Sequence, residues 1–194
     1  MPKKLCWRRL FLVVAAIGLV QATAGADDAK KEAQVAAIGD GAFEMPVPDG
    51  WVRKEPKVRI IEHEFEVPPA AGDEKPGRVT IMGAGGSIDD NIARWAGQFS
   101  QPDGSDTADK LKTRKATVAG QDVTFVDIRG TYEDKAGPFV PGPGVKRENY
   151  RMLSAIISTK KAGNYFIKFY GPENTVTGQE ANFMKMVEGL QPKG

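Results

Sequence analysis

The clearest pattern of hydrophobic and polar positions lies between Arg78 and Phe99, and it predicts a strand, a glycine turn and a helix. Val79 and Ile81 favour a strand, because β-branched side chains fit a pleated sheet. Ser87 follows the glycines and is suited to cap a helix N-terminus. From there the hydrophobic residues recur at helical spacing on one face, which predicts an amphipathic helix: Ile88, Ile92, Trp95, Ala96 and Phe99.

Six further segments have the composition and alternation of strands. The segment Val58 to Val67 alternates most regularly, with Glu62, Glu64 and Glu66 on one face and hydrophobic side chains on the other. Tyr150 to Thr159 is hydrophobic on both faces, which is typical of a strand in the middle of a sheet. The other segments predicted as strands are Ala42 to Val47, Lys112 to Val118, Val123 to Tyr132 and Tyr165 to Tyr170.

The end of the chain predicts a second helix, which follows Gly171-Pro172 and ends before Pro192. Hydrophobic residues recur there at helical spacing: Val176, Phe183, Met184, Val187 and Leu190. Two amphipathic helices and about seven strands, many of them joined by turns, indicate an α+β domain. We expect a mainly antiparallel sheet with helices packed on both faces, an α/β/α sandwich.

The first residues have the pattern of an export signal. Lys3, Lys4, Arg8 and Arg9 form a basic region, and Leu10 to Val20 is a hydrophobic stretch shorter than the roughly 20 residues that cross a bilayer. Small residues before Ala26 predict cleavage there. We therefore expect a signal peptide at 1–26, an N-terminal tail or short helix at 27–41 and a single domain at 42–194, in a protein exported to the periplasm or the extracellular space.

Removal of this signal changes the charge and the cysteine content. Of the 27 Lys and Arg residues, four lie in the signal, so 23 remain against 25 Asp and Glu. The mature chain is then slightly acidic, which disfavours nucleic acid as a partner. It also loses Cys6, the only cysteine, and with it any disulfide or thiolate chemistry. No other hydrophobic run is long enough to cross a membrane, so we expect no stable membrane span after cleavage.

With these segments in place, the chain resembles the Mog1/PsbP-type α-β-α sandwich, which includes PsbP-like and DcrB-like secreted domains. The resemblance is carried by the turn Pro48 to Trp51, the charged strand Val58 to Val67, the helix with Asn91 and Trp95, and the closing strand and helix from Tyr165 to Leu190. These are turn and core residues, so they transfer no functional residue. The resemblance implies an assembly, stabilising or binding role in a secreted bacterial protein.

Motifs for catalysis and cofactor binding are weak in this chain. Gly83 to Gly86 precede a helix, but no Gly-Lys-Ser/Thr follows and Asp89 and Asp90 would repel an anion, so we expect a structural turn. His63 is the only histidine, which excludes a multi-histidine metal site. We interpret it as a hydrogen-bonded residue at the margin of the core. We expect no catalytic residue, metal or cofactor.

The best candidate surface surrounds the loop from Gly137 to Gly144, which is rich in glycine and proline. Aromatic and arginine residues at the foot of a long loop are typical of binding surfaces. The candidate binding residues are Tyr132, Phe139, Arg147, Tyr150 and Arg151. The sequence thus predicts a non-catalytic binding or assembly module for an unknown protein or small ligand. Two alternatives stay open: a small hydrolase or metal-assisted enzyme that uses His63, and a purely structural envelope protein.

Overall fold

The computed structural model describes residues 34–135 and 143–193, which belong to one compact unit, Glu32–Gly194. The predicted signal peptide at 1–26 lies outside the described residues, as do Phe139 and most of its loop. The strands of the described part are β1 (Val35–Ile38), β2 (Phe43–Pro46), β3 (Val52–Lys54), β4 (His63–Val67), β5 (Gly77–Ala84), β6 (Phe99–Ser100), β7 (Lys112–Val118), β8 (Gln121–Asp134), β9 (Val145–Thr159), β10 (Gly163–Pro172) and β11 (Gln191–Pro192). The helices are α1 (Ile88–Ala96), α2 (Thr107–Lys110), α3 (Glu173–Gly178) and α4 (Glu180–Glu188). None of these helices is long and hydrophobic enough to cross a membrane.

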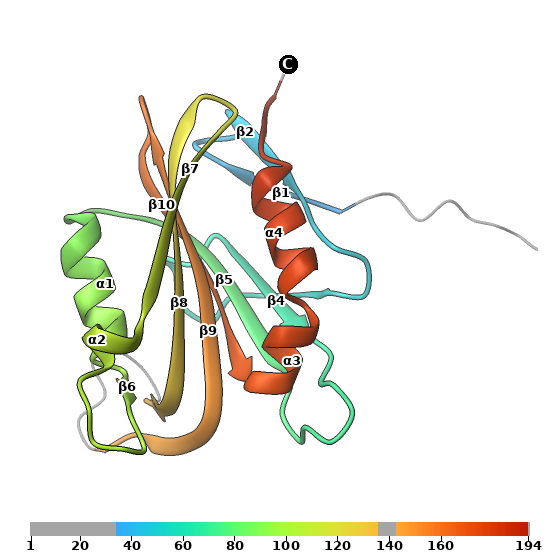
Figure 1. Ribbon diagram of the computed structural model, residues 1–194. Helices are drawn as coiled ribbons and strands as arrows, with labels where there is room; N and C mark the ends of the chain where they lie inside the picture. Colours follow the sequence, from blue (N-terminus) through green and yellow to red (C-terminus); the bar gives the residue numbers. More distant parts are fainter. Residues whose placement is uncertain (1–33, 136–142, 194) are drawn as a thin grey trace, which may run out of the picture. The chain divides into compact units, whose positions relative to one another are not determined.

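The main sheet has eight strands, is antiparallel and forms the centre of the domain (Figure 1). Its order is β3-β4-β5-β10-β9-β8-β6, and β7 pairs with β8. A second sheet of three strands has the order β1-β2-β11. The predicted α+β class and mainly antiparallel sheet are therefore confirmed for the described residues. The predicted central strand is confirmed as well, because β9 pairs with β8 on one side and β10 on the other.

Local sequence signals predict the first helix well. Ser87 is the N-cap of α1, and its hydroxyl accepts a hydrogen bond of 3.0 Å from the backbone N–H of Asp90. The helix ends at Ala96 rather than continuing to Phe99, because Phe99 begins β6 and pairs with Tyr132 of β8. The hairpin of β7 and β8 also forms as predicted, around Ala119 and Gly120 at positive φ.

Other segments differ from their predictions, mainly because strand pairing with distant segments decides where each strand begins and ends. The strand predicted from Val58 begins only at His63, because β3 provides no partner beyond Lys54 and the segment turns through an Ile61 N–H to Val58 carbonyl bond of 3.0 Å. The region predicted as a tail or short helix contains β1, which pairs with β2. The single closing helix is instead two, α3 and α4, which meet at Gln179.

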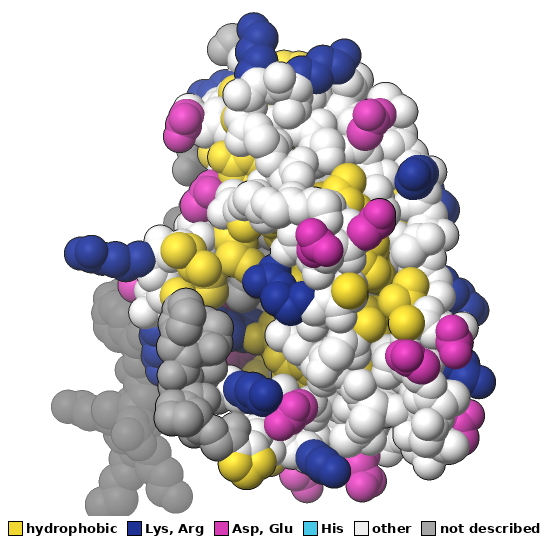
Figure 2. Space-filling view, turned by 90° about the vertical axis from the view of Figure 1, so that its left-hand side faces the viewer, with side chains coloured by type: hydrophobic (Ala, Val, Ile, Leu, Met, Phe, Trp, Pro, Cys, Tyr) yellow, Lys and Arg dark blue, Asp and Glu magenta, His cyan; other side chains and the backbone are white. Residues whose placement is uncertain are grey.

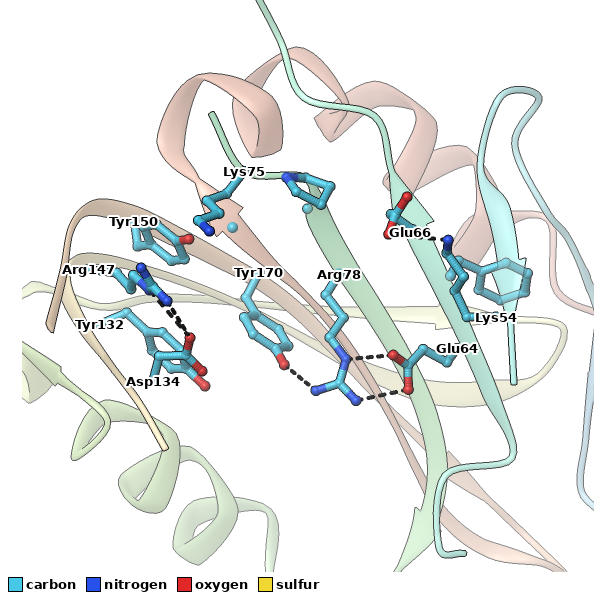
Figure 3. Close-up of a pocket in the computed structure, with 14 residues that line it drawn as sticks. Lys54, Glu64, Glu66, Lys75, Arg78, Tyr132, Asp134, Arg147, Tyr150 and Tyr170 are labelled. Carbon is cyan, nitrogen blue, oxygen red and sulfur yellow. Dashed lines mark hydrogen bonds and ion pairs between the residues drawn. The ribbon is translucent and has the colours of Figure 1, made fainter. Parts of the chain in front are cut away.

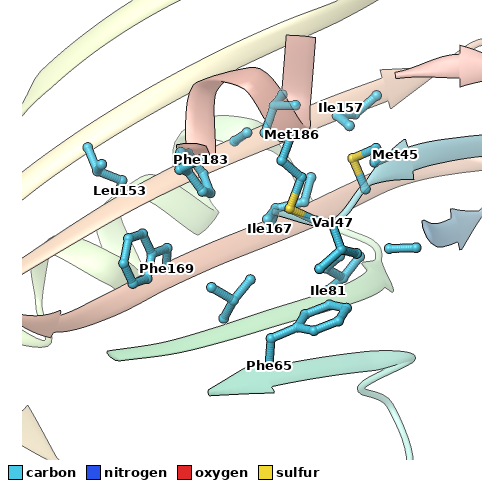
Figure 4. Packing of buried hydrophobic residues seen from close by; sticks show 14 of the residues in the cluster. Met45, Val47, Phe65, Ile81, Leu153, Ile157, Ile167, Phe169, Phe183 and Met186 are labelled. Atoms are coloured by element: carbon cyan, nitrogen blue, oxygen red, sulfur yellow. The ribbon is translucent and has the colours of Figure 1, made fainter. Parts of the chain in front are cut away.

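Two clusters of buried hydrophobic residues pack against alternate positions of β10. Phe166, Lys168 and Tyr170 lie on one side of this strand, the Phe166 face, while Ile167 and Phe169 lie on the other, the Phe169 face. Trp95 of α1 meets the Phe166 ring edge-on at 5.8 Å between centroids. Phe183 of α4 meets Phe169 at 6.0 Å, in a cluster that also receives Met45 of β2 (Figure 4).

Arg151 of β9 links the sheet to the closing helices from within the Phe169 face. Its side chain is only 2% exposed. The guanidinium donates to both carboxylate oxygens of Asp127 at 2.9 Å, to Glu180 at 2.8 Å and to Thr177 at 3.1 Å. Such a bidentate, buried ion pair fixes geometry, and loss of one partner leaves the other charge uncompensated.

We therefore expect Arg151→Met to lower the free energy of unfolding by about 2–4 kcal/mol, since it leaves the half-buried Asp127 only the longer, exposed contact with Arg129 at 3.8 Å. Urea denaturation followed by circular dichroism would measure this change. Lys110→Met is a matched control, because Lys110 forms an exposed pair with Asp103 at 3.6 Å, and its urea midpoint should not move. An Arg151→Met midpoint equal to that of the control would show that the buried network does not stabilise the fold.

Lys168 is a second buried cation, placed on the Phe166 face. Its ammonium donates to the Gln98 side chain at 3.1 Å and lies 5.6 Å from the Trp95 ring and 5.5 Å from the Tyr170 ring. Within the described residues, no carboxylate pairs with it. Burial, reinforced by the charges of Arg94 and Arg78, lowers the pKa of Lys168 from 10.5 to about 8.

This lowered pKa gives a pH dependence with a definite sign. Between about pH 8 and 10.5 the unfolded chain holds a proton on Lys168 that the folded chain has released, so stability rises with pH in that window. We expect the protein to gain about 1–3 kcal/mol there relative to Lys168→Met. Urea denaturation of both proteins at several pH values measures the difference, and a difference that does not change with pH would contradict the assignment.

Candidate functional site

A pocket of about 270 Å³ opens at the end of the Phe166 face that lies beyond the Trp95 contact of α1. We call it the tyrosine pocket. Figure 3 shows its polar and aromatic side chains, which come from β3, β4, β5, β8, β9, β10 and the segment before β5. They are Lys54, Glu64, Glu66, Lys75, Arg78, Tyr132, Asp134, Arg147, Tyr150 and Tyr170.

Three tyrosine rings form one wall of the pocket. Tyr132 and Tyr150 stack in parallel, with centroids 5.9 Å apart and an interplanar angle of 3°. Tyr170 meets Tyr132 at 5.3 Å in a tilted arrangement. Phe99 supports Tyr132 from behind at 5.2 Å. Aromatic pairs in these geometries add to the stabilisation from burial, so the wall is held rigidly.

Arg78 anchors the opposite side of the pocket. Its Nε and Nη2 donate to the two carboxylate oxygens of Glu64 at 2.9 and 2.8 Å, and its Nη1 donates to the Tyr170 hydroxyl at 2.6 Å. Glu64 belongs to the row of glutamates that the sequence pattern placed on one face of the charged strand. Its side chain is only 16% exposed. The fork of hydrogen bonds ties β4, β5 and β10 together at the pocket floor.

An irregularity in β9 brings Arg147 to the same side as Tyr150. The pairing of β8 with β9 passes from Gly130↔Tyr150 to Tyr132↔Arg147, so β9 carries one extra residue. Asn149 absorbs it at φ 55°, a conformation that asparagine tolerates. Opposite it, Gly130 has φ 144°, and a Cβ there would lie 2.6 Å from the Ser100 carbonyl oxygen. Strict alternation would have placed Arg147 on the face away from Tyr150.

The structure thus brings together three of the residues predicted from the sequence and separates a fourth. Tyr132, Arg147 and Tyr150 line the tyrosine pocket. Arg151 points to the other face, where it is buried against Asp127 and Glu180, so it does not belong to this surface. Phe139 lies outside the described residues. Sequence analysis missed Arg78 and Tyr170, whose only signal is that each is a polar or amphipathic residue on an otherwise hydrophobic strand.

The glutamates of the charged strand do not converge on one point. Glu62 accepts a hydrogen bond of 3.0 Å from the Gly83 N–H, Glu64 pairs with Arg78, and Glu66 pairs with Lys54 at 3.3 Å. In the described part of the chain, no group of three or more His, Cys, Asp or Glu side chains is placed to hold a metal ion.

His63 has both ring nitrogens engaged in structural contacts. Arg53 donates to Nδ1 at 2.9 Å, so the ring carries its proton on Nε2 and donates it to the Ala37 carbonyl at 2.7 Å. Arg53 also donates to the Val35 carbonyl at 2.6 Å. These bonds connect the edge of the main sheet to β1, as expected for a hydrogen-bonded histidine at a core margin.

The face of the molecule that carries α1 mixes hydrophobic and charged side chains. Figure 2 looks at the molecule from the α1 side, where hydrophobic side chains gather around a central basic one and acidic and basic side chains alternate toward the margins.

The chain matches no protein-family model and no curated protein sequence. Several solved structures are similar in three dimensions. The cyanobacterial PsbP protein CyanoP from Synechocystis superposes with a TM-score of 0.50 at 12% identity, over 91% of this chain and 100% of CyanoP. LpqN of Mycobacterium tuberculosis, described as involved in cell envelope biogenesis, gives 0.46 at 11% identity, over 83% and 90%.

The Ran-binding protein Mog1p of Saccharomyces cerevisiae gives a TM-score of 0.43 at 10% identity, over 82% of this chain and 95% of Mog1p. At these identities the similarity concerns the fold and transfers no activity or site residue. The match to CyanoP spans nearly all of this chain and confirms the resemblance seen in the sequence. The chain therefore has a PsbP-like fold, of the Mog1/PsbP type.

Proposed function

We propose that the protein is an exported, non-catalytic binding or assembly module whose contact surface is the tyrosine pocket. The observation that carries this proposal is the tyrosine wall facing the Arg78–Glu64 fork. Tyrosine and arginine are among the residues most enriched where partners bind, because tyrosine offers a large contact area at a low cost in conformational entropy and arginine offers several hydrogen-bond donors. Here both are already fixed by neighbours, so binding requires little further ordering.

Export is supported by the sequence rather than by the fold. The basic residues before Leu10 and the hydrophobic stretch that follows have the order of a cleavable signal. We therefore propose that residues 1–26 are removed, and that the domain acts outside the cytoplasm, in the periplasm or the extracellular space.

We also infer that the domain is a three-layer sandwich in the PsbP-like manner. Trp95 of α1 packs on Phe166, and Phe183 of α4 packs on Phe169. Since Phe166 and Phe169 are an odd number of residues apart on β10, the two helices cover opposite faces of the sheet. The tyrosine pocket then lies where α1 does not reach.

The size of the pocket supports a protein partner over a large cofactor. Its volume of about 270 Å³ is below the roughly 300–1,000 Å³ of pockets that enclose drug-sized ligands. A space of this size accommodates one or two side chains of a partner that otherwise contacts the rim. The engagement of His63 in two structural hydrogen bonds supports the non-catalytic role over the hydrolase alternative.

Site-specific crosslinking in the producing cells tests the proposal. We expect a photoreactive benzoylphenylalanine in place of Tyr150 to give a discrete adduct, because this ring borders the pocket and any partner seated there contacts it. The same residue in place of Lys161, an exposed position in the turn before β10, serves as the control and should give none. Adduct formation at Tyr150 should fall by more than half when Arg147→Ala is combined with it.

Two results would count against the proposal. One is the absence of any adduct at Tyr150 when the protein is fully exported and folded, as judged by protease resistance. The other is an identical set of adducts at both positions, which would indicate random collisions.

A further inference from the structure

The charges of the tyrosine pocket cancel in pairs, with one exception. Glu64 is held by Arg78 at 2.8 Å, Glu66 by Lys54 at 3.3 Å and Asp134 by Arg147 at 3.3 Å. Within the described residues, Lys75 is the one charged group of the pocket that has no oppositely charged partner. In Figure 3 its ammonium lies at the upper rim, toward Tyr150. The pocket therefore carries a surplus positive charge at its rim.

Arg147 adds hydrogen-bond donors to this rim. Its Nε and Nη2 both reach the same oxygen of Asp134 at 3.3 Å, which is long for a charge-assisted pair. Its Nη1 makes no hydrogen bond to the described part of the chain. An incoming anion can therefore pair with Arg147 without displacing a strong bond.

The hydroxyls of Tyr132 and Tyr150 are further hydrogen-bond donors for an anion. Neither makes a hydrogen bond with the described residues, whereas the Tyr170 hydroxyl accepts one from Arg78. Both phenols are protonated at neutral pH and can donate a hydrogen bond, and burial raises the pKa of Tyr132 and Tyr150 further. The tyrosine wall therefore lies among hydrogen-bond donors that have no partner in the described residues, whereas the carboxylates of the pocket are already paired with cations.

Building on the proposed function, we propose that the tyrosine pocket binds an acidic side chain of a partner polypeptide, Asp or Glu, with a neighbouring aromatic side chain against the tyrosine wall. Lys75, Arg147 and the Tyr150 hydroxyl receive the carboxylate. Tyr132 and Tyr150 present the aromatic surface. Chain-terminal carboxylates are captured mainly by rows of backbone N–H groups, whereas the donors here are side chains, so a side-chain carboxylate is the occupant that fits.

Short peptides test this proposal directly on the ¹⁵N-labelled protein by NMR titration. The probe is acetyl-Phe-Glu-amide, which carries a side-chain carboxylate and an aromatic ring. Acetyl-Phe-Gln-amide is its neutral match, and acetyl-Gly-Phe carries only a chain-terminal carboxylate. We expect the first peptide to shift the amides of β9 and β10 around the pocket saturably in the millimolar range. The neutral peptide should bind at least about fivefold more weakly, the effect of losing one charge-assisted contact. Acetyl-Gly-Phe should also bind more weakly than the acidic peptide, because its carboxylate is attached to the backbone of the aromatic residue itself and not to a neighbouring side chain.

A variant and its control test whether Lys75 is the cation that binds the carboxylate. Lys75→Gln should weaken the binding of acetyl-Phe-Glu-amide about fivefold to tenfold. It should leave the binding of acetyl-Phe-Gln-amide unchanged, because only the first peptide carries a charge. Lys161→Gln removes another exposed lysine, in the turn before β10 and away from the pocket, and should change the binding of neither peptide. Raising the salt concentration should reduce the difference between the two peptides.

The inference is overturned if the neutral peptide binds as well as the acidic one, if Lys75→Gln has no effect, or if the chain-terminal peptide binds most tightly. These outcomes are separable from a failure of the proposed function. Adducts at Tyr150 without binding of the acidic peptide would mean that the pocket meets its partner through other chemistry. Absence of adducts would reject the contact surface itself.

Discussion

The structure depends on a mismatch of length between α1 and the sheet it contacts. A helix of nine residues extends about 14 Å, whereas β10 with ten residues extends about 33 Å. The helix can therefore shield less than half of the length of β10 on the Phe166 face, and the described residues at the other end of this strand line the tyrosine pocket. The sequence of β10 follows this limit: Phe166 packs under Trp95, Lys168 lies at the boundary, and Tyr170 borders the open pocket.

The end of the face that α1 does not reach is stabilised by polar groups that bond to one another. Arg78, Glu64 and Tyr170 form a network across three adjacent strands, and Tyr132 and Tyr150 cover the hydrophobic surface beside it. A hydrophobic residue at these positions would leave an exposed apolar patch, which favours non-specific association. A network of paired charges and aromatic rings instead gives a rigid surface that interacts favourably with water.

The other face shows the contrast. There the buried cluster is hydrophobic and joins residues of the strands to Met45 of β2 and Phe183 of α4. Among the described residues, the one buried charge on this face is Arg151, and Asp127 and Glu180 compensate it. The same strand, β9, therefore carries a fully paired structural arginine on one face and a weakly paired arginine, Arg147, on the other.

Features that depend on neighbouring residues could be predicted from the sequence, and those that depend on distant pairing could not. The Ser87 cap, the β7–β8 hairpin and the central position of β9 follow from local patterns. The small sheet joins segments from opposite ends of the chain, so nothing local indicates it. The site was half predictable: Tyr132, Arg147 and Tyr150 are close in sequence, but the extra residue at Asn149 decides which face each one reaches.

A double-mutant cycle between Arg78 and Glu64 tests most directly whether this network stabilises the uncovered face. The free energy of unfolding would be measured in urea for the protein, Arg78→Met, Glu64→Gln and the double variant. Because Arg78 is partly exposed while Glu64 is largely buried, our account predicts a coupling energy of about 1–2 kcal/mol. A coupling energy indistinguishable from zero would contradict it, because the pocket floor would then hold together without this pair.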